Sequence, residues 1–178
     1  MRTTPAFRLC CAFAALLPAI ALAQTPPVKP GLWEITSDRN AGGRKGPPPA
    51  DRLKNMPPEA RAKIEAMMRE KGVAMNADGT TRICMTKETM DPARWANTAS
   101  CKTDYATRSS SSWKWHSVCT QPQGVVDGEA VFASTESYTI STSTTFTLSG
   151  EAKVSQHKMQ GKWLGGDCGD LKPFDPRR

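Results

Sequence analysis

Residues 138–149 alternate strictly between two kinds of side chain, and this pattern restricts the fold more than any other feature of the chain. Every second residue, starting at Thr139, is a serine or threonine, whereas Tyr138, Ile140 and Phe146 lie among the residues between them. A period of two residues indicates a β-strand, because successive side chains of a strand point to opposite faces. Such β-branched, hydroxyl-rich alternation is typical of an antiparallel sheet with one face on a core and one in solvent.

The same period recurs in shorter segments that are separated by turn-forming residues. We expect further strands at residues 31–37, 80–86, 101–109, 113–120, 129–134 and 152–164, with Asp127-Gly128 as a hairpin turn. The predicted fold class is mainly β with one α-helix: a curved antiparallel β-meander or an open barrel with an embedded amphipathic helix. A β-sandwich is the alternative, since the number of strands does not separate the two.

Residues 57–71 have the period of a helix instead. Pro57 lies in the expected first turn, and Gly72 follows as the C-cap. The apolar side chains of this helix share one stripe: Ala60, Ile64, Met67 and Met68. Residues 39–55 are rich in glycine, proline and basic side chains, so we expect a flexible basic linker there. We expect this linker to connect the helix to the first strand and the methionine stripe to pack against the concave side of the sheet.

Residues 1–23 have the features of a secretory signal peptide. Arg2 and Arg8 precede or begin an apolar run, and Ala21-Leu22-Ala23 has the small-x-small pattern of a cleavage site. The run of about 15 residues is shorter than the roughly 20 that cross a bilayer. We therefore expect cleavage after Ala23 and a single exported domain of residues 24–178, with its core at about 30–169 and no transmembrane span. The expected location is the periplasm, with secretion as the alternative.

Four cysteines lie beyond the signal segment: Cys84, Cys101, Cys119 and Cys168. An even number in an exported chain, without the close pairs that structural zinc uses, indicates two disulfides and no metal site. Of the three possible pairings we expect Cys84 with Cys101 and Cys119 with Cys168. The first would close a local excursion of the chain, and the second would tie the last strand to the middle of the sheet.

The positive charge of the chain is concentrated in one stretch. Residues 39–71 hold nine basic and four acidic side chains, a net charge of +5, and the rest of the expected mature chain is neutral. This excess is too small, and the expected compartment is wrong, for a nucleic-acid partner. The basic helix could lie on anionic lipid. The simpler interpretation is that its charged side chains form a solvated face of a helix that packs on the sheet.

Motifs of catalysis are absent from the sequence. There is no nucleotide-binding glycine motif, no nucleophile elbow and no zinc-protease motif, and we expect no cofactor. The chain has two histidines, His116 and His157, and His116 could pair with Asp104 or Asp127 as a base. A histidine in a strand is more often a hydrogen-bonded surface or core residue, so we assign no catalytic residue.

Tryptophan and methionine are the best candidates for an apolar ligand pocket in the hollow of the sheet. Such pockets are concave and lined mainly by apolar and aromatic side chains. The candidates in the sequence are Trp33, Met67, Met68, Trp113, Trp115 and Trp163, with Trp95 as a further tryptophan. The same side chains could equally form the core.

Three motifs together resemble the domain of unknown function 3617 family, whose members are small exported proteins of Gram-negative bacteria. They are Pro30-Gly31-Leu32-Trp33-Glu34, then Met56-Pro57-Pro58-Glu59 before a helix with Met67-Met68, and the segment from Trp163 to Gly169. The likeness covers about residues 30–169. It implies a single periplasmic or envelope-associated domain and supplies no catalytic residue.

Three functional hypotheses follow, in order of preference. The first is a non-enzymatic periplasmic protein that binds an apolar or lipid-like ligand between sheet and helix. The second is an envelope interaction protein that contacts anionic lipid or another protein through its basic helix. The third is an unrecognised hydrolase that uses His116 or His157, which would need a carboxylate and a hydroxyl within reach of one imidazole.

Overall fold

The structure is a computed structural model, and it describes residues 25–38, 49–91, 100–148 and 151–175 of the 178-residue chain. Its strands are β1 (Gly31–Asp38), β2 (Val73–Met75), β3 (Thr81–Met85), β4 (Cys101–Arg108), β5 (Ser112–Thr120), β6 (Gln123–Ser134), β7 (Ser137–Leu148) and β8 (Glu151–Gly165). Its helices are α1 (Pro49–Lys54) and α2 (Pro58–Glu70).

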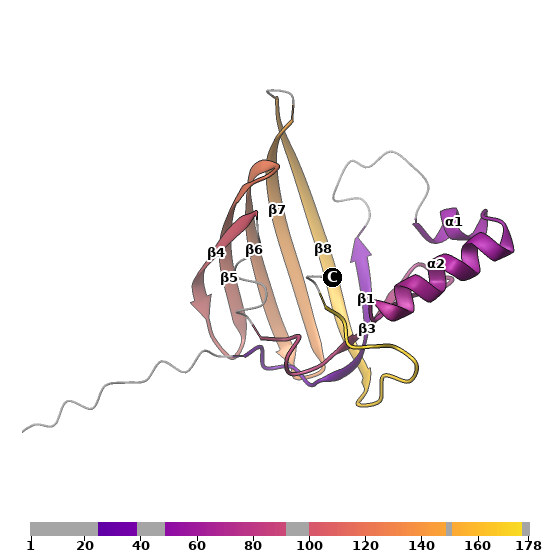
Figure 1. The fold of residues 1–178 in the computed structure, drawn as a ribbon. Coiled ribbons are helices and arrows are strands. Elements are labelled where there is room, and N and C mark those ends of the chain that lie inside the picture. Colours follow the sequence, from indigo (N-terminus) through magenta and orange to yellow (C-terminus); the bar gives the residue numbers. More distant parts are fainter. Residues whose placement is uncertain (1–24, 39–48, 92–99, 149–150, 176–178) are drawn as a thin grey trace, which may run out of the picture.

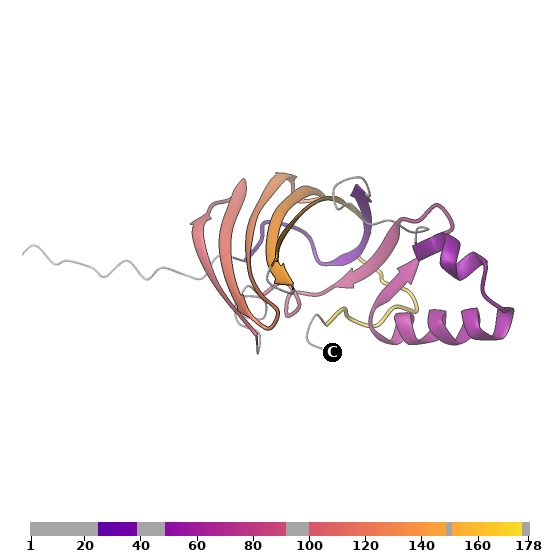
Figure 2. The ribbon, with the colours of Figure 1, turned by 90° about the horizontal axis from the view of Figure 1, so that it is seen from above.

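All eight strands belong to one antiparallel sheet with the order β2-β3-β1-β8-β7-β6-β5-β4. The last five strands follow one another as a meander, and β1 adds to β8, so the two ends of the domain lie side by side (Figure 1). Seen from above, the sheet curls strongly (Figure 2). The sheet does not close into a barrel, because its edge strands β2 and β4 do not pair. The prediction of a mainly β, curved and open antiparallel meander is thus confirmed.

The predicted turn at Asp127-Gly128 is wrong. Both residues lie in the middle of β6, and β5 and β6 are joined instead through Gln121 and Pro122. Gly128 is a packing position: it lies opposite Trp115, and a Cβ atom there would come within 2.1 Å of the indole ring. The glycine therefore makes room for an aromatic ring and does not reverse the chain.

Aromatic rings fill the buried face of the sheet. Trp33 is fully buried, and Trp113 and Tyr138 are 6% and 7% exposed. The centroids of the Trp33 and Tyr138 rings are 5.0 Å apart, a distance at which aromatic side chains attract beyond simple burial. Tyr138 also lies over Gly161 of the neighbouring strand, where a Cβ atom would meet its ring at 2.3 Å. On this face, aromatic rings thus pack over glycines of the neighbouring strand, where no side chain occupies the space.

Helix α2 confirms the predicted helix but not its predicted place. It ends at Glu70, and Gly72 then adopts a positive φ of 75°, as expected of a residue just beyond a helix. No residue of α2 is buried, and the helix packs on the edge strand β2, outside the curl of the sheet (Figures 1 and 2). The reason is the connection: only Lys71 and Gly72 separate α2 from β2, so the helix cannot reach the concave side.

The segment before α2 was predicted as a linker over residues 39–55. Residues 39–48 lie outside the described part of the chain, and Pro49–Lys54 form the short helix α1. Trp95 also lies outside the described residues. Neither described helix has the length and apolar character that crossing a bilayer requires.

Two disulfides form, but the predicted pairing is wrong. Cys101 bonds to Cys119, its direct neighbour across β4 and β5, and Cys84 bonds to Cys168. The sequence reasoning placed the end of β8 beside the middle of the sheet. Because β1 lies between β8 and β3, the chain leaving β8 emerges beside the end of β3, where Cys84 is located.

Candidate functional site

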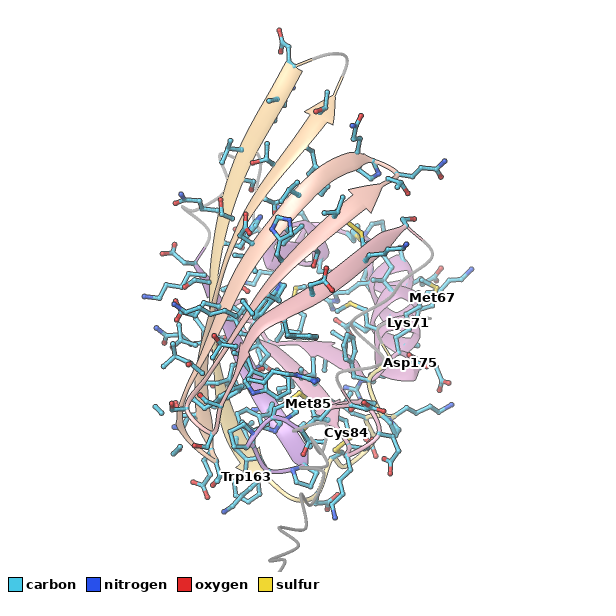
Figure 3. The ribbon with its side chains drawn as sticks, turned by 90° about the vertical axis from the view of Figure 1, so that its left-hand side faces the viewer. Met67, Lys71, Cys84, Met85, Trp163 and Asp175 are labelled. Atoms are coloured by element: carbon cyan, nitrogen blue, oxygen red, sulfur yellow. A yellow bond between two sulfur atoms is a disulfide. The ribbon has the colours of Figure 1, made fainter. Side chains whose placement is uncertain are left out.

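The six residues predicted to line an apolar pocket do not form one cluster: Trp33 lies opposite Trp163 across β1 and β8, whereas the two methionines are on α2 and the other two tryptophans on β5. Trp33 and Trp113 belong to the buried core, and their indole N–H groups donate to the backbone oxygens of Lys29 (2.9 Å) and Ser109 (3.1 Å). Trp163 stands at the end of β8, where its indole donates to the Pro30 oxygen at 3.1 Å. Figure 3 shows it well apart from Met67 of α2.

A shallow and open groove of about 700 Å³ lies over the described strands. It is bordered by two rows of polar side chains that run across the strands. One row is Asp38, Lys158, Ser141, Glu129 and Lys114, and the other is Gln156, Ser143, Asp127 and His116. Residues in these rows are two apart along each strand, so both rows share one face of the sheet. Of the predicted pocket residues only Trp115 lines this groove.

Opposite charges in the groove face each other across β5 and β6. The Lys114 ammonium lies 3.3 Å from the Glu129 carboxylate, and His116 Nδ1 lies 2.8 Å from Asp127 Oδ1. These side chains are about half exposed, and ion pairs in that setting contribute less than about 1 kcal/mol. The two rows that border the groove therefore carry both signs of charge in nearly equal numbers.

The two histidines do not form a hydrolytic centre in the described part of the chain. His116 pairs with Asp127, one of the two carboxylates expected for it. His157 Nε2 lies 3.1 Å from the Ser155 hydroxyl. His157 follows Gln156, which is in the row of His116, so the two imidazoles point to opposite faces of the sheet. A catalytic triad needs one histidine with both a carboxylate and a hydroxyl partner. Here His116 has the carboxylate partner and His157 has the hydroxyl partner.

Burial governs the titration of the two tyrosines behind the groove. Loss of contact with water raises the pKa of Tyr138 to about 12. Burial also raises the pKa of Tyr105, and the nearby positive charge of Arg108 opposes this change. The Arg108 guanidinium lies 4.5 Å from the Tyr105 ring and 5.1 Å from the Trp113 ring, a cation–π arrangement that sequence reasoning missed. The described residues contain no cluster of three or more His, Cys, Asp or Glu side chains suited to a metal ion.

Helix α2 carries an exposed apolar side chain, Met67, that is flanked by basic residues. Met67 is 55% exposed, and Lys63 and Lys71 lie one turn before and one turn after it. Figure 3 shows Met67 and Lys71 on the same part of the helix. Lys63 and Lys71 form no ion pair with the described residues, whereas Arg61 and Arg69 pair with Glu65 and Asp170. The sequence contains this stripe, but its exposure follows from the position of the helix.

Comparisons with known proteins agree with the resemblance noted in the motifs. The chain is 33% identical over 129 residues to an uncharacterised Pseudomonas putida protein, "Uncharacterized protein in lpd-3 5'region", covering 65% of this chain and 89% of that protein. No solved structure matches the chain. The family model "Protein of unknown function (DUF3617)" matches residues 28–168. The chain belongs to the DUF3617 family.

Proposed function

We propose that this protein is a non-enzymatic protein of the periplasm that docks on an anionic lipid surface through α2. The observation that carries the proposal is the place of α2: a helix with an exposed methionine and no buried residue packs on the edge strand β2, outside the curl of the sheet. A helix with an apolar stripe bordered by basic residues can lie in the plane of a lipid interface.

The distribution of charge supports a negatively charged partner. Residues 39–71 carry a net charge of +5, in a mature chain that is otherwise neutral. Helix α2 itself has three basic and three acidic side chains, so the excess lies before the helix and at Lys71. Lys63 and Lys71 are exposed on either side of Met67, and each basic side chain near an anionic membrane contributes about 1 kcal/mol. Two such lysines would strengthen binding by more than about tenfold, which is measurable.

The packing of the aromatic residues argues against a carrier of an apolar ligand, and the partners of the two histidines argue against a hydrolase. A carrier of an apolar ligand needs a hollow lined by Trp and Met side chains. Here Trp33 packs against Tyr138, which lies over Gly161, and Trp113 contacts Tyr105 and Phe132. The groove is bordered mainly by charged and hydroxyl side chains. A hydrolase needs a histidine with two suitable partners, and His116 and His157 each have one of them.

The test is co-sedimentation of the mature protein with vesicles of phosphatidylcholine alone and of phosphatidylcholine mixed with phosphatidylglycerol. We expect binding only to the anionic vesicles, with an affinity that falls as salt is added, because salt screens the attraction. The double variant Lys63→Glu, Lys71→Glu should lose this binding. The matched control, Lys102→Glu, Lys153→Glu, has the same net charge but changes exposed lysines of the sheet, and it should bind more strongly than the helix variant.

Equal binding of the two double variants would show that net charge alone is responsible and would refute a role for α2. Absence of binding to anionic vesicles would refute the proposal as a whole. In that case, a protein partner captured from the periplasm by the wild type and not by Met67→Asp would support the other form of the interaction hypothesis.

A further inference from the structure

The segment that follows β8 lies against the C-terminal end of α2. Residues 168–175, here named the C-terminal strap, begin at Cys168, which bonds to Cys84 of β3. The strap makes a second contact with the same residue, because the Phe174 amide donates to the Cys84 oxygen at 2.8 Å. Its two ends are therefore joined to one point of the sheet, the first covalently and the second by a hydrogen bond.

Between these two points the strap contacts the end of α2. Lys172 forms an ion pair with Glu70, and Asp170 lies 3.7 Å from Arg69. At Gly72, an added Cβ atom would lie 2.3 Å from the Lys172 oxygen and 2.6 Å from the Phe174 nitrogen. The strap thus passes directly over the turn that ends the helix. In the view of Figure 3, Asp175 lies between Lys71 and Cys84.

The rest of the domain holds α2 weakly. The helix has no buried residue, and the element it packs on is β2, the three-residue edge strand. Segments with few buried contacts open locally at a small cost in free energy. The strap is therefore a second support of α2 besides β2.

We propose that the Cys84–Cys168 disulfide is a latch that fixes α2 through the C-terminal strap, and that reduction of this bond releases the helix. Reduction requires a dithiol. One thiolate of the dithiol attacks Sγ of Cys168, which is more exposed than Cys84, and forms a mixed disulfide while Cys84 leaves as a thiolate and takes up a proton. The second thiol then displaces Cys168, so that the protein gains two thiols and the reductant becomes a disulfide.

As regulation of lipid docking, this inference rests on the proposed function: release would free Ile64 and Met68, half-buried in the latched state, to join Met67 at a lipid surface. As a statement about the fold, it stands without that function. The two parts can be tested separately.

The first experiment is hydrogen exchange, followed by mass spectrometry, on the mature protein with both disulfides and on two double variants. In Cys84→Ser, Cys168→Ser we expect the amides of α2 to exchange at least about tenfold faster than in the wild type. The matched control, Cys101→Ser, Cys119→Ser, removes the disulfide between β4 and β5 and should leave α2 unchanged. Equal protection of α2 in the wild type and the Cys84 variant would overturn the latch.

A third variant keeps the test decisive if the cysteine variant fails to fold, which would be seen as lost protection of β6 and β7. Lys172→Glu retains both disulfides and places a second negative charge beside that of Glu70. It should speed exchange in α2 and not in β7, and an unchanged α2 would again overturn the latch. Vesicle binding is then measured before and after reduction: faster exchange without tighter binding would confirm the latch and refute only its regulation of lipid docking.

Discussion

The buried hydroxyl of Tyr138 makes the stability of this domain sensitive to alkaline pH. Its pKa is 10.0 in an unfolded chain and about 12 in the folded protein, because burial disfavours the tyrosinate anion. Below pH 10 the side chain is neutral in both states and its burial is fully favourable. Above pH 10 the unfolded chain loses the proton first, so unfolding becomes more favourable. The stability associated with this proton is therefore lost as pH rises from 10 to 12.

The size of the effect follows from the change in pKa. Each pKa unit corresponds to about 1.4 kcal/mol, so about two units amount to roughly 3 kcal/mol of unfolding free energy. The assay is urea denaturation at a series of pH values between 9 and 12. The free energy of unfolding of the wild type should fall more steeply than that of Tyr138→Phe, which retains the aromatic ring over Gly161 but has no proton to lose.

Comparison with Tyr138→Phe removes the contribution of lysines, which titrate over the same range in both proteins. Tyr105 is the other tyrosine of the chain and is present in both proteins as well. Parallel curves for the wild type and Tyr138→Phe would refute the reasoning, because they would mean that the hydroxyl of Tyr138 reaches water in the folded state. Tyrosinate absorbance that develops at the ordinary pKa while the protein is folded would lead to the same conclusion.

Three further predictions test the packing of the sheet and the groove. Gly128→Ala should lower the free energy of unfolding by about 1–3 kcal/mol, because the new methyl group overlaps the Trp115 ring, whereas Gly166→Ala, with open space at the Cβ position, should change it little in the same urea titration. Trp33→Ala should cost about 3–5 kcal/mol by removing a fully buried side chain, and a loss below 1 kcal/mol in calorimetry would contradict its place in the core. His116→Ala should change stability by less than about 1 kcal/mol, an effect that added salt should diminish, because the imidazole and its carboxylate partner are exposed.

Local patterns in the sequence were sufficient for the elements themselves. The alternation in residues 138–149 predicted strand β7, and Pro57 together with Gly72 predicted the limits of α2. Burial also alternates along most of β5, in agreement with the strand predicted at residues 113–120. These features depend on side-chain period and on capping, which are properties of neighbouring residues.

Pairing between distant segments was beyond these patterns. The disulfide partners depend on β1 lying between β8 and β3, and nothing near Cys84 or Cys168 in the chain indicates that order. Gly128 was interpreted as a turn residue because its neighbour Asp127 makes a common turn dipeptide. Its role is to leave room for the Trp115 ring, and this role depends on a residue of another strand.

By itself, the sequence determined the fold class, the helix with its methionine stripe, and the family. Only the tertiary structure decided that the stripe stays outside the sheet, that the predicted pocket residues do not form one cluster, and that the strap lies over the end of α2. The physical reason is that periodicity specifies which side of an element is apolar. What covers that side depends on strand order and on the length of the connection between α2 and β2, and these act over the whole chain.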